Sequence, residues 1–115
     1  MIVQRRDIWY ADLNGGQGSE QNGARPVLVV SNEKNNIHSN TITIVPITSR
    51  TKKPLATHIK VSKTYANGLS KDGFILCEHI RTISKDRLQN RIGKLNKILM
   101  HQVDNAMMVQ LGIGG

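Results

Sequence analysis

Short apolar segments separated by polar loops fill most of the chain and predict a mainly β protein. Some of these segments alternate apolar and polar residues, whereas others are continuously apolar and rich in β-branched residues. We expect strands over residues 7–13, 26–32, 40–49, 57–62, 73–83 and 90–95.

Two of these segments carry proline. Residues 26–32 read PVLVVSN, a continuous apolar run typical of a strand that is buried on both faces. Pro26 suits the first position of that strand, where no ladder donor is required. Residues 40–49 alternate Thr and Ile until Pro46, which predicts a bulge or an edge position there.

The periodicity changes after Asn96. Apolar residues recur at 99, 100, 103, 106, 107 and 111, which places them on one face of a helix. Asn96 is positioned to cap the start of this helix, and Gly112 is positioned to end it. Its methionines indicate core packing rather than a partner or cofactor surface. The predicted architecture is α+β and mainly β: a small β-barrel or curled sheet closed by a C-terminal helix, in one domain over residues 1–115.

The charge balance points to polyanion partners. Sixteen Lys and Arg against eight Asp and Glu give a net charge of +8. This surplus favours nucleic acid first and an acidic protein second, with a solubilising surface as the plain alternative. Aromatic residues make up only 3% of the chain, which argues against a single-strand binder built on rows of stacking rings.

Metal sites, disulfides and membrane spans are not expected. Cys77 is the single cysteine, so no intrachain disulfide can form and a reducing, cytoplasmic setting is the default. Cys77 and His79 would share a strand face, but a stable metal site usually needs three or four ligands. We therefore expect no metal or other cofactor, and a small buried Cys77. The apolar runs are too short to span a membrane, so we expect a soluble protein without a membrane partner.

Arg25 stands between a polar, glycine-bearing loop and the apolar strand, in EQNGARPVLVV (20–30). Pro26 disfavours helix at Arg25 and fixes its own backbone, which holds the guanidinium at a stiff junction. A guanidinium can bind phosphate through two parallel hydrogen bonds. On local sequence alone, the plainer interpretation is an arginine that snorkels at a strand end or pairs with Glu20. Thr48, Ser49 and Arg50 offer a second place where hydroxyls beside a cation could contact phosphate.

The order of segments resembles the MazF/PemK family of toxin endoribonucleases. The matching segments are RRDIWYADL (5–13), GSEQNGARPVLVVSN (18–32), VPITS (45–49), THIKV (57–61) and LCEHIRTISKDRL (76–88). The resemblance implies an SH3-like, PemK-type barrel with a C-terminal helix. It also implies a homodimer that cuts single-stranded RNA, chiefly messenger RNA, at short sequences without a metal.

The resemblance assigns roles to individual residues. Arg25 and Thr48 match the family's catalytic pair, while its RNA-binding segments fall on Ser19, Glu20, Gln21, Glu78 and Arg81. The position of four neighbours of Thr48 makes them further candidates for RNA contacts: Ser49, Arg50, Lys52 and Lys53. His79 departs from the glutamine expected there, which concerns fine substrate contacts. Neither His58 nor Glu20 is assigned as the proton carrier.

The expected chemistry is attack of the RNA's own 2′-hydroxyl on the adjacent phosphorus, which gives 2′,3′-cyclic phosphate and 5′-hydroxyl ends. Arg25 would stabilise charge on the phosphoryl oxygens, and Thr48 would hold the phosphate in register. The resemblance also implies an acidic antitoxin of the MazE type, whose disordered tail would suit the basic surface.

Two other functions remain open. A DNA gyrase poison on the same barrel would be expected to act through C-terminal residues that include a tryptophan, whereas this chain ends in QLGIGG. A non-catalytic RNA-binding module is the other alternative, because Arg25 and Thr48 do not by themselves exclude it.

Overall fold

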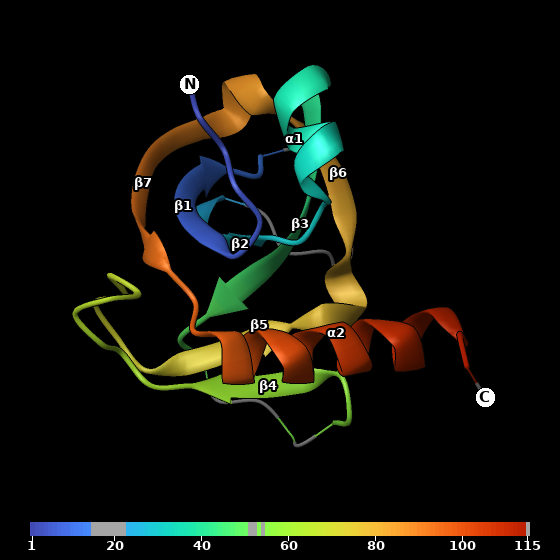
Figure 1. The fold of residues 1–115 in the computed structure, drawn as a ribbon. Coiled ribbons are helices and arrows are strands. Elements are labelled where there is room, and N and C mark those ends of the chain that lie inside the picture. The colour runs from blue at the N-terminus through green and yellow to red at the C-terminus, as the bar shows by residue number, and fades with distance from the viewer. Residues whose placement is uncertain (15–22, 51–52, 54, 115) are drawn as a thin grey trace.

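A computed structural model describes residues 1–14, 23–50, 53 and 55–114. Seven strands, two α-helices and two short 3₁₀ helices follow one another along these residues (Figure 1). In chain order they are β1 (Asp7–Asp12), β2 (Ala24–Val29), α1 (Glu33–His38), β3 (Thr41–Thr48), β4 (His58–Val61), β5 (Gly73–Leu76), η1 (Cys77–His79), β6 (Arg81–Ser84), η2 (Lys85–Arg87), β7 (Leu88–Lys94) and α2 (Lys97–Leu111).

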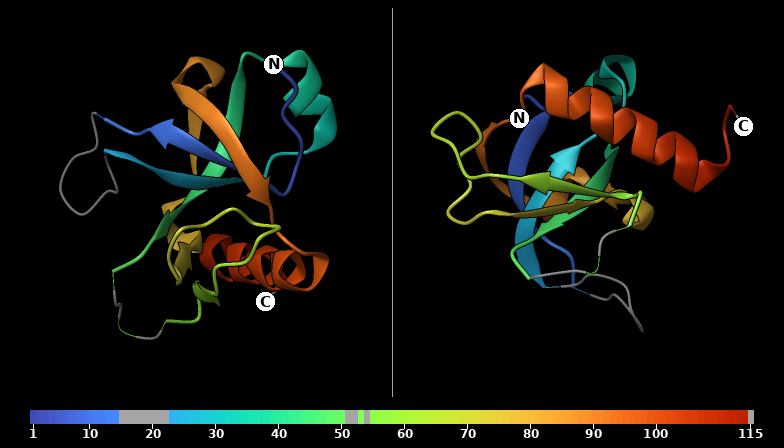
Figure 2. Two further views of the ribbon diagram at one scale, coloured as in Figure 1. Left: turned by 90° about the vertical axis from the view of Figure 1, so that its left-hand side faces the viewer. Right: turned by 90° about the horizontal axis from the view of Figure 1, so that it is seen from below.

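The strands form one antiparallel sheet in the order β4-β5-β3-β2-β1-β7, and β6 pairs with β3 beside this path. The mainly β prediction with a C-terminal helix is therefore confirmed. Closure into a barrel is wrong, because within the described residues the sheet stays open at β4 and β7. The strands curl around the interior instead, as Figure 2 shows from two sides.

Both faces of β2 are covered, as its continuous apolar sequence predicts. Val27 and Val29 belong to one buried cluster with Trp9, Ile42 and neighbouring residues of β1, β3 and β6. Leu28 belongs to a second cluster, which includes the buried residues of α2. Alternate side chains of a strand point to opposite faces, so one strand supplies two cores.

Strand β3 changes its partner along one edge. Residues Thr41–Ile44 pair with β6, whereas Ile47 and Thr48 pair with β5. Pro46 lies between these two partners and stays in regular register with Val27 of β2 on the other side, so the expected bulge is absent from that pairing. Pro46 has no backbone N–H to donate. It lies where the hydrogen bonds from β3 to β6 have ended and those from β3 to β5 have not yet begun.

The single strand expected over residues 73–83 is wrong. The segment is divided into β5 and β6 by η1 at Cys77–His79. The break follows from the two partnerships of β3, because the chain must turn between them. Helix α1 was not expected either. Asn32 caps it, with its side-chain oxygen accepting a hydrogen bond from the Asn35 backbone N–H at 2.8 Å.

Helix α2 forms as predicted. The Asn96 side chain accepts a hydrogen bond from the Leu99 backbone N–H at 2.8 Å, and Gly112 ends the helix in the left-handed conformation with φ 68°. Met100, Val103 and Ala106 are buried, and the helix packs against β4 and η1. Neither described helix has the length and apolar character needed to cross a bilayer.

Candidate functional site

Arg25 and Thr48 lie across from one another at the ends of neighbouring strands. The β2–β3 register pairs Val27 with Pro46, and continuing it by two residues sets Arg25 opposite Thr48. Residues directly opposite on antiparallel strands project to the same side of the sheet. The proline that follows Arg25 and the regular pairing beyond it therefore direct both side chains to one place.

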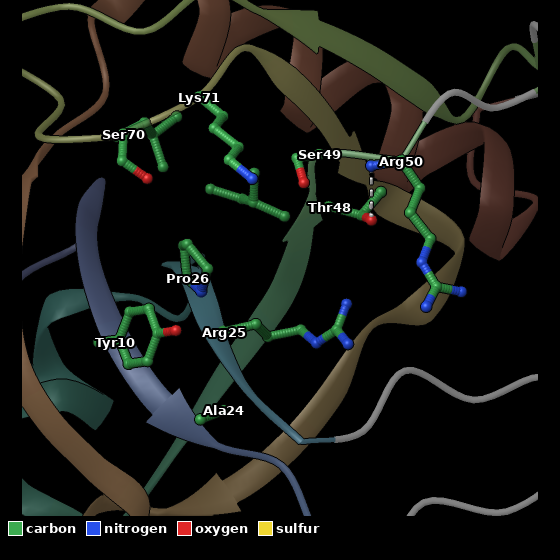
Figure 3. A pocket seen from close by; sticks show the side chains of 11 residues that line it. Tyr10, Ala24, Arg25, Pro26, Thr48, Ser49, Arg50, Ser70 and Lys71 are labelled. Carbon is green, nitrogen blue, oxygen red and sulfur yellow. Dashed lines mark hydrogen bonds between the residues drawn. The ribbon is translucent and has the colours of Figure 1, made fainter.

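That place is a pocket of about 290 Å³, shown in Figure 3. Its described walls come from the ends of β1, β2 and β3 and from the loop between β4 and β5. The lining residues are Tyr10, Ala24, Arg25, Pro26, Ile47, Thr48, Ser49, Arg50, Leu69, Ser70 and Lys71. Among them three are cationic and none is acidic, so the pocket favours an anion.

The two guanidinium groups of the pocket lie close enough to influence each other. Partial burial lowers the pKa of Arg25, the positive charge of Arg50 lowers it further, and Tyr10 opposes the shift. Both main causes destabilise the charged form of the guanidinium. A phosphate placed beside the two side chains would reverse the second effect, because its negative charge attracts both cations.

Thr48 is almost fully buried yet faces the pocket, with 4% of its surface exposed. Its hydroxyl oxygen accepts a hydrogen bond from the Arg50 backbone N–H at 3.2 Å (Figure 3). This contact orients the oxygen and leaves the hydroxyl hydrogen to be donated. Thr48 can therefore donate a hydrogen bond to a phosphoryl oxygen held by the neighbouring cations.

The other residues expected to contact RNA do not all lie at this pocket. Ser49 and Arg50 line the pocket, whereas Lys53, Glu78 and Arg81 are not among its described walls. Lys53 is exposed and its carbonyl lies 3.1 Å from His58 Nδ1. Four candidates lie outside the described residues: Ser19, Glu20, Gln21 and Lys52. The alternative pairing of Arg25 with Glu20 falls there as well.

Glu78 is paired with His58, which the sequence did not indicate. Its Oε2 lies 2.5 Å from His58 Nε2, and the histidine side chain is only 7% exposed. The other carboxylate oxygen of Glu78 is buried and has no hydrogen-bond partner among the described residues. The pair thus links η1 to the start of β4 and, through His58 Nδ1, to the backbone at Lys53.

Cys77 and His79 do not share a strand face, because both lie in η1 rather than in a strand. Cys77 is fully buried, as expected, and burial is the main reason its thiol pKa rises to about 12, with Glu78 and Asp104 adding to the shift. In the described part of the chain, no three His, Cys, Asp or Glu side chains form a group that could hold a metal ion.

Three polar residues of the pocket were missed by the sequence analysis: Tyr10, Ser70 and Lys71. Tyr10 belongs to β1 and pairs with Pro26, so its position depends on the β1–β2 register. Ser70 and Lys71 belong to the polar segment NGLSKDG (67–73), which has turn-forming residues but no local sign of a binding role.

The fold and the pocket define a small protein with a curled antiparallel sheet, a C-terminal helix and a cationic site at the strand ends. The protein shares its fold with a crystal structure of MazF from Deinococcus radiodurans, with a TM-score of 0.86 over 98% of this chain and 99% of that one at 20% identity. The chain belongs to the family of PemK-like, MazF-like toxins of type II toxin-antitoxin systems, whose family model matches residues 4–111.

Two further relatives bear names that describe an activity. The chain is 43% identical over 115 residues to "Endoribonuclease EndoA" of Bacillus subtilis (strain 168), covering 98% of this chain and 97% of that protein. It also matches the structure of an "Endoribonuclease in complex with its cognate antitoxin from Mycobacterial species" at 25% identity, with a TM-score of 0.81 and coverage of 98% of both chains.

Proposed function

We propose that this toxin is a sequence-specific, metal-independent endoribonuclease that cleaves single-stranded messenger RNA. The observation that carries the proposal is the meeting of Arg25 and Thr48 in one cationic pocket. A 43% identical relative named as an endoribonuclease supports the same activity.

The proposed reaction is a transesterification within the RNA. The 2′-oxygen forms a bond to the adjacent phosphorus, and the bond from phosphorus to the 5′-oxygen breaks. The 2′-hydroxyl loses its proton, and the leaving 5′-oxygen gains one. The products carry 2′,3′-cyclic phosphate and 5′-hydroxyl ends. Negative charge grows on the phosphoryl oxygens in the transition state, so fixed donors aimed at those oxygens accelerate the step.

Arg25 and Thr48 supply such donors. The Arg25 guanidinium offers charge-assisted hydrogen bonds, and the Thr48 hydroxyl offers a neutral one from the facing strand. Arg50, beside them, adds a second positive charge.

We further propose that the toxin acts as a homodimer and is inhibited by an acidic antitoxin of the MazE type. The net charge of +8 favours an acidic partner. A structural relative whose name includes its cognate antitoxin supports this type of partner.

The first experiment incubates the purified protein with single-stranded RNA in EDTA and identifies the product ends. We expect cleavage to give cyclic phosphate and 5′-hydroxyl ends, and we expect a substrate with 2′-deoxyribose at the cleaved position to stay intact. Arg25→Ala should reduce the rate about 10²–10³-fold or more, because it removes donors to the transition state. Arg25→Lys keeps a charge and should recover part of the loss.

Each variant is first compared with the wild type by circular dichroism and urea unfolding, so that a lost fold is not taken for a lost donor. Normal cleavage by folded Arg25→Ala would contradict the proposed role of the pocket. Inhibition of DNA gyrase without RNA cleavage would support the gyrase-poison alternative. RNA binding without cleavage would support the non-catalytic binding module.

A further inference from the structure

The loop between β4 and β5 is fixed by its own hydrogen bonds. Asn67, of which only 4% is exposed, accepts hydrogen bonds through its side-chain oxygen from the backbone N–H groups of Thr64 and Leu69, both at 3.0 Å. Its side-chain amide donates to the Ser62 carbonyl at 2.9 Å. One buried side chain thus joins three points of the loop, and a satisfied buried network of this kind rigidifies the backbone.

The loop is also anchored to β7. A Cβ at Gly68 would stand 1.8 Å from the Ile92 carbonyl oxygen, so the backbones approach too closely for any residue except glycine. The Lys94 backbone N–H donates to the Ala66 carbonyl at 3.0 Å. Leu69 is 7% exposed and belongs to the core cluster that α2 covers.

The two residues after Leu69 are exposed and line the pocket that holds Arg25 and Thr48. In Figure 3 the Lys71 side chain extends into the pocket toward Ser49, from the side opposite Arg50. None of the ion pairs found within the described residues involves Lys71. The rigid loop therefore presents a third cation to the pocket, away from the two arginines.

We propose that Lys71 positions the RNA by binding the phosphate next to the one that is cleaved. This inference rests on the proposed endoribonuclease function. Single-stranded RNA carries one negative charge per nucleotide. When the scissile phosphate lies between Arg25 and Thr48, the phosphate of an adjacent nucleotide would therefore lie close to the same pocket. The Lys71 ammonium is a compact charge on a flexible stem and suits a phosphate contact without base readout.

The competing explanation is an exposed lysine that only adds solubility, and Lys63 provides the matched control. Lys63 lies on the same loop and is exposed, but it is not among the described walls of the pocket. Lys71→Ala and Lys63→Ala remove the same charge from the same loop. A general effect of net charge would appear in both variants, whereas a phosphate contact would appear only in the first.

The binding experiment uses a short RNA with 2′-deoxyribose at the mapped cleavage position, so that the wild-type protein binds it without cutting. Lys71→Ala should weaken binding roughly 3- to 10-fold, and Lys71→Arg should restore most of it. The slope of log Kd against log salt should fall by about 0.7, the value for one phosphate contact on a single strand. Lys63→Ala should leave the slope unchanged. In cleavage assays Lys71→Ala should raise KM and leave kcat nearly unchanged.

A second measurement identifies the phosphate. Each phosphate that flanks the scissile one is replaced in turn by an uncharged methylphosphonate. Replacement of the phosphate that Lys71 contacts should weaken RNA binding to the wild type. The same replacement should not weaken RNA binding to Lys71→Ala any further, because that variant has already lost the contact. Equal salt slopes for Lys71→Ala and Lys63→Ala, or no phosphate coupled to Lys71, would overturn the inference. Absence of RNA cleavage by the wild type would instead contradict the proposed function.

Discussion

Single residues of the pocket show how positive charge is gathered at a strand end. Arg25 keeps its position because Pro26 and the β1 and β2 pairing fix the backbone on either side of it. Burial and the charge of Arg50 lower the pKa of Arg25, so the pocket holds two cations at an electrostatic cost. A bound phosphate would remove part of that cost, and anion binding would then stabilise the site.

Cys77 offers a prediction at the same scale. Its thiol pKa is raised from 9.0 to about 12, so the neutral thiol is favoured and the thiolate appears only near pH 12. At pH 8 the difference between 12 and 9.0 leaves about 10³-fold less thiolate than an ordinary cysteine has. We expect native Cys77 to react with iodoacetamide about 10³-fold more slowly than it does in urea.

Cys77 is the only cysteine, so mass spectrometry of the intact protein reports on this thiol alone. Labelling of the folded protein at the unfolded rate would show that the thiol is accessible and ionised. Slow labelling would also agree with a reaction that does not use Cys77 as a nucleophile.

At the scale of elements, the loop between β4 and β5 depends on one glycine. Gly68 has φ +71°, and an added Cβ would stand 1.8 Å from a backbone oxygen of β7. Gly68→Ala should therefore combine backbone strain with a steric overlap and lower the free energy of unfolding by about 2–5 kcal/mol. Urea unfolding followed by circular dichroism measures this change.

Gly112 is the matched control for that substitution. Its φ of +68° is nearly the same, but an added Cβ would have no heavy atom within 4 Å. Gly112→Ala should cost only about 1 kcal/mol, from the left-handed backbone at the end of α2. Equal losses for the two variants would mean that the close approach to β7 contributes nothing to stability.

The elements also show what the sequence could and could not predict. Strand β2 and helix α2 were predictable because their burial and caps follow from local patterns. The division of residues 73–83 into β5, η1 and β6 was not, because it depends on β3 having two partners on one edge. Helix α1 did carry a local signal in Asn32, which caps it, but its six residues give little periodicity to detect.

The pocket likewise combines residues that the sequence identified with residues that only the tertiary structure reveals. Family resemblance singled out Arg25 and Thr48, and the strand register explains why they meet, although neither residue's own surroundings in the sequence reveals the other. Lys71 lies in a polar turn that looks like an ordinary loop. Its place in the pocket comes from Gly68 and Leu69, which pack the loop against β7 and the core. Such contacts are tertiary and leave no periodic signature.

Across the whole molecule, the net charge of +8 suits both of the proposed partners. RNA and an acidic antitoxin are both polyanions, and both are attracted by a basic surface over a distance of about one Debye length, ~8 Å at physiological salt. The pocket concentrates three of these cations around Thr48. Two polyanions that use the same cations cannot both be bound there.

Competition between the proposed partners is the prediction at this scale. The cognate antitoxin is titrated into toxin bound to a fluorescent RNA with 2′-deoxyribose at the cleaved position. We expect the apparent Kd for RNA to rise in proportion to free antitoxin, because binding of one partner removes the charges needed by the other. Lys71→Ala weakens the RNA and should allow displacement at lower antitoxin concentration, whereas Lys63→Ala should behave as the wild type. A complex that holds antitoxin and RNA together at full affinity would show that the antitoxin inhibits from a surface outside the pocket.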